Sequence, residues 1–141
     1  RVRRQRQMCI RDSFYYIVQM DLSYNRFNKF PFEALYIQTL RSIAVRHQRD
    51  ADGYRCMKEW PTNVATCPVL QRLFLGGNDI GEVPETEEIS YRIYILDISD
   101  NPEIVINISA VCPYITAGMY TLIYDSWQNI RGCPALKLEN K

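Results

Sequence analysis

The chain lacks several features that would place it in a common functional class. It has no apolar run approaching the roughly eighteen residues that a membrane-spanning helix needs. Its five cysteines include no Cys-x-x-Cys pair and its one histidine stands apart from them, so the spacing predicts no zinc site. Gly76 and Gly77 lack the further glycines and the Lys-Ser/Thr pair of a phosphate-binding loop. We therefore expect no metal and no cofactor, and we interpret the glycine pair as a turn.

The single histidine also limits the catalytic arrangements open to the chain. A nucleophile activated by histidine would have to use His47, which lies between Arg46 and Arg49 just beyond an apolar segment. A charged histidine in a loop explains this position better than a catalytic base does.

One acidic cluster resembles the start of a calcium-binding loop. It consists of Asp50, Asp52 and Gly53, but the glycine comes too early for such a loop. Pro61 also occupies the position that the bidentate glutamate would require. The sequence instead predicts a turn at Asp52-Gly53. Because the sequence indicates neither a catalytic nor a metal site, we expect that the chain is not an enzyme.

The first thirteen residues differ from the rest in charge. Their MCIRDS string resembles translated sequencing-adapter sequence, so we expect residues 1–13 to be non-native or a disordered tail. A basic arm that binds nucleic acid is the alternative. Removing the five arginines and one aspartate of this segment leaves 12 basic against 15 acidic residues, a net charge of −3 instead of +1. Because residues 14–141 carry a net negative charge, we expect that the partner is not a nucleic acid.

An apolar pattern occurs four times between residues 17 and 101. Three apolar residues precede an amide residue by eight, five and three positions, which is the pattern LxxLxLxxN. The four sets are Ile17, Met20, Leu22 and Asn25; Leu40, Ile43, Val45 and Gln48; Leu70, Leu73, Leu75 and Asn78; and Ile93, Leu96, Ile98 and Asn101. Successive sets lie 23, 30 and 23 residues apart. Recurrence at this period indicates a stack of similar coils.

The spacing within each set has a physical explanation. The last two apolar residues alternate with outward-facing residues, which is the period of a short strand with one buried face. The amide residue turns the chain, and its side chain can bond backbone groups of its own coil or a neighbouring one. One coil cannot bury its apolar side alone, so the coils are expected to stack with their strands in one parallel sheet.

This pattern resembles the leucine-rich repeat family over roughly residues 16–110. Two coils also carry the NxLxxIP continuation of that family, at Phe27, Phe30 and Pro31 and at Ile80, Val83 and Pro84. The second coil departs from the pattern, with Gln48 replacing asparagine and about seven extra residues before Trp60. The resemblance implies an α/β-type leucine-rich repeat solenoid, with short parallel β-strands on the concave face and loops and short helical turns on the convex face.

The C-terminal segment is expected to cap this solenoid. After Asn101 the pattern ends, and alternation from Met119 to Tyr124 predicts one more strand over the last coil. We therefore divide the chain into a tail at residues 1–13, four repeats over residues 14–110 and a cap over residues 111–141. Similarity to the stapled caps of secreted leucine-rich proteins implies a disulfide between Cys112 and Cys133, with unpaired thiols as the alternative.

The outward residues of the predicted strands form a candidate binding surface. Aromatic side chains beside arginine are typical of binding hot spots. The candidate ligand-binding residues are Asp21, Arg46, Arg72, Phe74 and Asp97. We expect a non-catalytic module that binds a protein through the concave face, with a glycan as an alternative ligand. The competing hypothesis is a structural segment that closes a larger repeat protein, or a repeat array appended to an enzyme.

The start of the repeats suggests a longer protein. A solenoid needs polar caps at its ends, and no such cap precedes Ile17 in the sequence. We therefore expect a C-terminal fragment of an exported bacterial leucine-rich repeat protein. Its export signal would lie upstream, and its location would be extracellular or at the cell surface.

Overall fold

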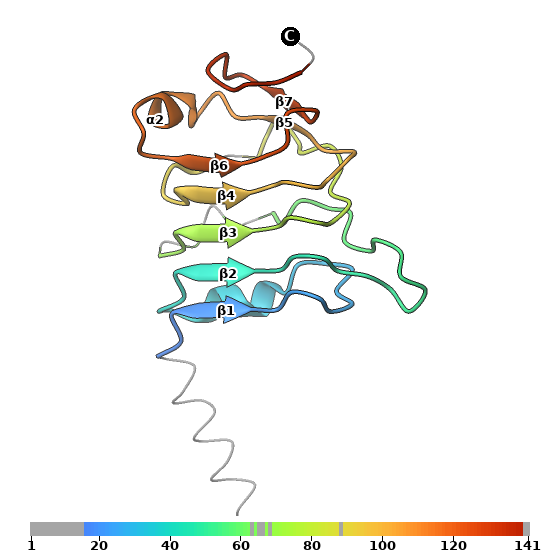
Figure 1. The fold of residues 1–141 in the computed structure, drawn as a ribbon. Coiled ribbons are helices and arrows are strands. Elements are labelled where there is room, and N and C mark those ends of the chain that lie inside the picture. Colours follow the sequence, from blue (N-terminus) through green and yellow to red (C-terminus); the bar gives the residue numbers. More distant parts are fainter. Residues whose placement is uncertain (1–15, 63, 65–66, 68, 88, 140–141) are drawn as a thin grey trace, which may run out of the picture.

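The computed structural model describes residues 16–62, 64, 67, 69–87 and 89–139 of the chain. The predicted tail at residues 1–13 lies outside this part. The described residues form a solenoid whose short strands stack in one parallel sheet (Figure 1). Across this sheet the strands are β1 (Gln19–Asp21), β2 (Ser42–Ala44), β3 (Arg72–Phe74), β4 (Ile95–Asp97) and β6 (Thr121–Ile123). The prediction of a parallel leucine-rich repeat solenoid is confirmed. We number coils 1 to 4 by their strands.

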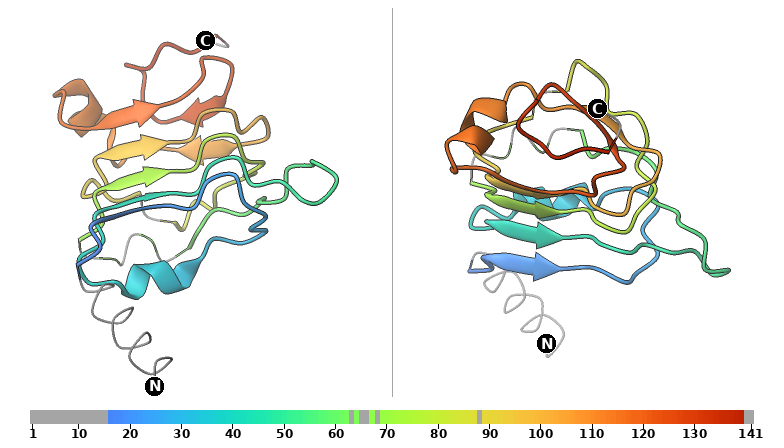
Figure 2. Two further views of the ribbon diagram at one scale, coloured as in Figure 1. Left: turned by 60° about the horizontal axis from the view of Figure 1, so that its bottom comes forward. Right: turned by 45° about the horizontal axis from the view of Figure 1, so that its top comes forward.

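The return segments behind the sheet contain little regular structure. The 3-10 helix η1 (Phe32–Tyr36) follows the first strand, and the short helix α2 (Cys112–Thr116) precedes β6. Strands β5 (Val105–Asn107) and β7 (Asn129–Arg131) pair in parallel as a second, smaller sheet. The left view of Figure 2 shows η1 on the far side of the solenoid from the sheet, with β5 and β7 beyond the ends of β4 and β6. The return segments close the hydrophobic core on the side opposite the concave face.

The core lies between the sheet and the returns. In coils 2 to 4 the apolar residues of the repeat pattern are buried, with Leu73 and Leu75 fully enclosed. In coil 1 the matching residues Ile17, Met20 and Leu22 are only partly buried. The same sequence pattern is therefore enclosed in the middle of the stack and partly open at its first coil.

A ladder of side-chain amides links the coils at the ends of their strands. Asn78 Nδ2 donates to the carbonyl oxygens of Val45 and Leu75, each at 2.9 Å. Its Oδ1 accepts the backbone N–H of Gln48 at 3.0 Å. Asn101 and Gln48 make matching bonds between their own and neighbouring coils. These buried amides satisfy backbone groups that would otherwise be desolvated without partners.

Each ladder amide of coils 1 to 4 follows a residue in the left-handed backbone conformation. Gly77 has a φ of 75°, while Tyr24, His47 and Asp100 have φ values of 60°, 53° and 51°. This conformation costs a non-glycine residue about 1–3 kcal/mol. Gly77 is required for a second reason, because a Cβ there would collide with the His47 ring. The turn geometry thus repeats although the residue type does not.

The insertion of coil 2 forms a loop over residues 49–60 that projects past the strand ends (Figure 1). The Gly53 N–H donates to the Asp50 carbonyl at 3.0 Å, which closes a turn at the tip. The Arg55 guanidinium anchors the loop. It donates at 2.6 and 2.7 Å to carbonyl oxygens in coils 3 and 4, and it pairs with the Asp100 carboxylate at 2.8 Å.

The C-terminal residues cover coil 4. Strand β6 pairs with β4 as the fifth strand of the sheet, where the alternating pattern predicted a strand. Gln128 is buried and extends the ladder, its Nε2 donating to a coil 4 carbonyl at 2.7 Å. A disulfide joins Cys112 and Cys133, whose Cα atoms lie 5.2 Å apart, while Cys56 and Cys67 are free thiols.

Candidate functional site

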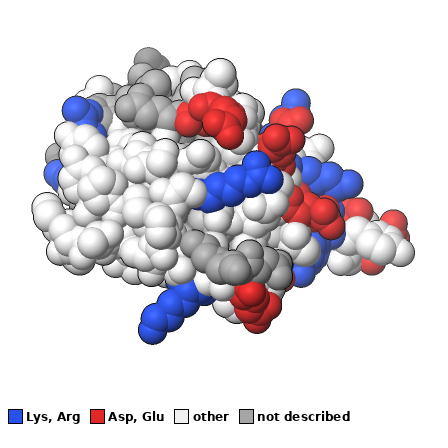
Figure 3. Space-filling view, turned by 90° about the horizontal axis from the view of Figure 1, so that it is seen from above, with Lys and Arg blue, Asp and Glu red and all other residues white. Residues whose placement is uncertain are grey.

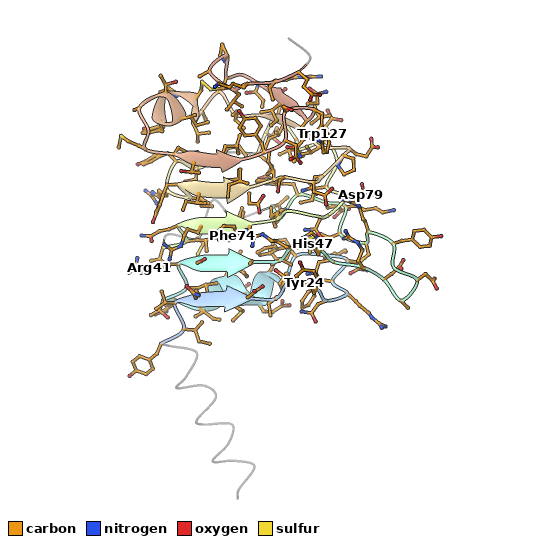
Figure 4. All side chains as sticks on the ribbon, in the orientation of Figure 1. Tyr24, Arg41, His47, Phe74, Asp79 and Trp127 are labelled. Atoms are coloured by element: carbon orange, nitrogen blue, oxygen red, sulfur yellow. A yellow bond between two sulfur atoms is a disulfide. The ribbon has the colours of Figure 1, made fainter. Side chains whose placement is uncertain are left out.

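The concave face carries three rows of outward residues. The strand register aligns Gln19, Ser42, Arg72 and Ile95 in one row, and Asp21, Ala44, Phe74 and Asp97 in the next. Backbone hydrogen bonds beyond the strands align Ser23, Arg46, Gly76 and Ser99 in the third. Figure 4 shows Phe74 on β3, in the middle of the sheet. Equivalent positions of the repeat pattern therefore lie side by side in the sheet.

Three of the candidate binding residues meet at the centre of this face. The Arg46 guanidinium carbon lies 4.4 Å from the centroid of the Phe74 ring, in cation–π geometry. Arg46 Nε also donates to Asp97 Oδ2 at 2.9 Å, so the side chain crosses coil 3 to reach coil 4. Gly76 leaves the space for this crossing, because a Cβ there would lie 2.9 Å from Asp97 Oδ2.

Asp97 is mainly a partner for groups of its own chain. It is only 3% exposed. Its Oδ1 accepts the Ser99 hydroxyl at 2.7 Å and the Ser99 backbone N–H at 3.0 Å. With Arg46 bound to the other oxygen, little of the carboxylate is open to a ligand.

Asp21 occupies the matching position in coil 1 but is exposed. Its Oδ1 accepts the Ser23 backbone N–H at 3.0 Å. Hydrogen bonds from the Ser23 side chain and backbone lower the pKa of the Asp21 carboxyl below its ordinary value, and Arg46 adds a smaller attraction. Asp21 is therefore an open negative charge at neutral pH, located at the first strand and apart from the central cluster.

Arg72, at the start of the central strand β3, is another charged residue of this surface. It is half-buried, and its guanidinium makes no hydrogen bond or ion pair to any residue that the structure describes. Beyond it, Ile95 and Ile123 continue the rows toward the C-terminal end. The concave face is thus polar and acidic at coil 1, whereas β4 and β6 each add one outward isoleucine beside a polar residue.

Two aromatic contacts were not predicted from the sequence. Tyr24 and His47 stack with ring centroids 4.8 Å apart, at the strand ends (Figure 4). His47, which we interpreted as a charged loop residue, lies between this ring and Gly77. Tyr91, in the segment that runs into β4, stacks on Tyr114 of α2 with ring centroids 5.1 Å apart. Each pair joins different coils, so no local sequence signal predicts it.

The hollows found among the described residues are not lined by Arg72, Phe74 or Asp97. An open hollow of about 620 Å³ lies beside the inserted loop, lined by residues that include Arg49, Arg55 and Asp79. Both arginines already donate to backbone carbonyls there.

Among the described residues, no group of three His, Cys, Asp or Glu side chains could hold a metal ion. Within the same part of the chain, no helix is long and apolar enough to cross a membrane.

The sequence and structure of the chain were compared with those of known proteins. No protein-family model and no curated protein matches the chain. A leucine-rich repeat protein from Bacteroides thetaiotaomicron VPI-5482 is 50% identical over 89% of the chain, with a TM-score of 0.84. One from Bacteroides eggerthii DSM 20697 is 52% identical over 88%, with a TM-score of 0.82. The chain spans only 15% and 20% of the lengths of these two proteins. The repeat pattern, the parallel solenoid and these similarities place the chain among the leucine-rich repeat proteins.

Proposed function

We propose that this chain is a non-catalytic module that binds a partner protein against the concave face of its solenoid. The observation that carries the proposal is the position of Phe74. This aromatic side chain occupies an outward position on the central strand, supported from one side by Arg46 and followed in its row by Asp97. Aromatic and arginine side chains at the centre of a surface are the usual sources of binding energy between proteins.

The chemistry of the central cluster divides the candidate residues into two roles. Arg46 and Asp97 neutralise each other and hold the Phe74 ring in place. Phe74 and Arg72 are left to contact a partner, the first by apolar burial and the second by its unpaired charge. Asp21 would contact the same partner only if that partner extends to the first coil.

A selection experiment tests this proposal. Binders would be selected against the folded chain from a phage-displayed library of small protein domains, and their affinities measured for Phe74→Ala and for the control Tyr36→Ala. Tyr36 is 84% exposed on η1, away from the sheet. Binders that converge on the concave face should lose affinity about tenfold or more with Phe74→Ala and little with the control.

The opposite pattern would contradict the proposal. If independent binders scatter over the surface, or if Phe74→Ala leaves their affinities unchanged while circular dichroism shows a folded chain, the concave face is no preferred binding surface.

A structural role is the second candidate, favoured by the closure of the C-terminal end. Gln128 ends the amide ladder, β6 covers β4, and the disulfide between Cys112 and Cys133 fixes α2 to the segment after β7. These features suit a segment whose task is to close a longer solenoid. Unchanged binding by a longer protein carrying Phe74→Ala and Arg72→Glu would favour this role.

The disulfide also supports an extracellular or cell-surface location, because disulfides persist in oxidising compartments. The test is alkylation of the unfolded protein without reductant, followed by mass spectrometry. Cys112 and Cys133 should resist alkylation, whereas Cys56 and Cys67 should react. Reaction of all four would contradict the proposed location.

A further inference from the structure

The strands alone are too small for a stable protein interface. Five strands at about 4.8 Å spacing, each three residues long, offer roughly 20 by 10 Å, or about 200 Å². A standard interface buries about 800 Å² on each partner. A partner of the concave face must therefore also cover one of the borders of the sheet.

One border has a distinctive composition. We define the leading edge as the segments that run into β2, β3, β4 and β6, namely residues 37–41, 69–71, 90–94 and 112–120. These segments contain no aspartate or glutamate, although the whole chain has 16 acidic residues. They contain Arg41 and Arg92, and Arg72 follows directly at the start of β3.

The arginines at this edge reach solvent, since Arg41 and Arg92 are exposed and Arg72 is half-buried. Within the described part of the chain, the guanidinium groups of Arg41, Arg72 and Arg92 make no hydrogen bond or ion pair. Figure 4 shows Arg41 at the side of the sheet from which the strands start. In Figure 3 the acidic groups of the visible face lie from its middle to the side opposite the leading edge, and the side of the leading edge shows basic and uncharged residues.

Aromatic and apolar side chains stand between these charges. Tyr94 is 36% exposed and Met119 is 67% exposed. Tyr91 stacks on Tyr114, and a side chain already held by such a contact loses less freedom on binding. Ile95, at the start of β4, joins this group to the concave face. Tyrosine and arginine are, with tryptophan, the residues enriched among binding hot spots.

From this arrangement, and resting on the proposed function, we infer that the partner presents an extended acidic segment to the leading edge. Its aspartate or glutamate side chains meet Arg41 and Arg72, and its aromatic or aliphatic side chains pack on Tyr94, Ile95 and the Tyr91–Tyr114 pair. Arginine pairs with carboxylates through two parallel hydrogen bonds, which gives direction as well as attraction. An unneutralised row of arginines also repels basic competitors and speeds association with acidic ones.

A peptide selection tests the inference. Random linear peptides displayed on phage would be selected against the folded chain. The best peptide would then be synthesised together with an analogue in which each glutamate or aspartate is replaced by its amide. We expect enriched peptides to combine acidic with aromatic or aliphatic residues. The amide analogue should bind about tenfold more weakly, and affinity should fall with added salt.

Matched variants of the chain locate the binding. Arg41→Glu with Arg72→Glu should weaken the acidic peptide at least about tenfold. Arg26→Glu with Lys29→Glu makes the same change in net charge at exposed residues outside the edge, and should leave affinity within about twofold. Tyr94→Ala adds an uncharged test of the same surface. All variants would first be shown to unfold cooperatively in urea.

The outcomes separate this inference from the proposed function. Enrichment of neutral or basic peptides that still depend on Phe74 would overturn the inference and leave the concave-face proposal standing. Acidic peptides that depend on Arg41 and Tyr94 but not on Phe74 would support the inference and contradict the role proposed for Phe74. Failure to enrich any peptide would overturn the inference, while the domain selection above would still decide the proposed function.

A polysaccharide control decides the class of partner. Polygalacturonate carries the same carboxylate chemistry without apolar side chains. Polygalacturonate could bind the chain and lose affinity for the variant that carries Arg41→Glu and Arg72→Glu. If no peptide shows the same dependence, the inference of a protein partner is wrong and the edge binds an acidic glycan.

Discussion

Coil 1 and coil 3 carry the same LxxLxLxxN pattern, but they differ in what surrounds them. Leu73 and Asn78 of coil 3 are fully buried between two neighbouring coils. Met20 of coil 1 is only partly buried, and Asn25 is exposed. The pattern therefore determines which side chains turn inward, while the neighbouring coils determine how much each side chain contributes to stability.

The largest difference between the two coils is expected in the apolar core. Leu73→Ala should lower the free energy of unfolding by about 3–4 kcal/mol, because it removes buried surface and leaves a cavity in an enclosed site. Met20→Ala should cost about 1 kcal/mol, since its site can relax and is already partly hydrated. Urea unfolding followed by circular dichroism measures both. Equal losses would show that coil 1 is as enclosed as coil 3.

The ladder amides give the next largest difference. Asn78→Ala leaves two buried carbonyls and the Gln48 N–H without their partner, and should cost about 2–3 kcal/mol. Asn25 also donates to two carbonyls of its own coil, but water can replace those bonds. Asn25→Ala should therefore cost less than about 1 kcal/mol. Hydrogen exchange of the Gln48 amide gives an independent measure, with faster exchange expected only in Asn78→Ala.

A smaller difference in stability is expected between two equivalent aspartates, Asp97 in coil 4 and Asp21 in coil 1. Asp97→Asn removes the charge that Arg46 binds in a nearly buried site, and should cost about 1–2 kcal/mol. Asp21→Asn should cost much less, because an amide oxygen can still accept the hydrogen bonds from Ser23 and solvent screens the smaller attraction to Arg46. In an Arg46→Gln background the cost of Asp97→Asn should shrink. A cost that stays the same would exclude coupling between the two side chains.

The smallest expected effect is in the titration of Asp21. Hydrogen bonds from Ser23 hold its pKa below the ordinary value in the folded chain, so this carboxyl stabilises the fold above the pKa of the unfolded state. The contribution is lost as the pH falls through the lowered folded pKa, in the acidic range below about 4. Carboxyl NMR titration should show a low pKa that rises in Ser23→Ala. An unchanged pKa would contradict the assigned cause.

Much of the fold was predictable because it depends on periodicity. The four sets of apolar residues and amides determine the strands and their parallel register. The alternation from Met119 to Tyr124 likewise predicted the strand that became β6. The alternating isoleucines at positions 104, 106 and 108 were an available signal for β5, but its partner β7 lies more than twenty residues away.

The remaining features depend on contacts between coils. Gly76 leaves room for Arg46 to reach Asp97, and the pairing occupies the Asp97 carboxylate and one N–H of the Arg46 guanidinium. The repeat pattern predicts that both residues lie at outward positions of the backbone, and they do. It does not predict that their side chains bind each other. The leading edge was also missed, since its residues are scattered in the chain and become neighbours only when the coils stack.

The two ion pairs of the described chain have a consequence for how the solenoid opens. Arg46 pairs with Asp97 and Arg55 pairs with Asp100, so both connect coil 2 to coil 4 and pass over coil 3. In a simple stack each coil interacts only with its two neighbours, and any coil can melt next to an open one. Here coil 3 cannot detach from coil 4 without disturbing contacts that coil 2 makes. Coils 2 to 4 should therefore open as one cooperative block, while coil 1 frays independently of them.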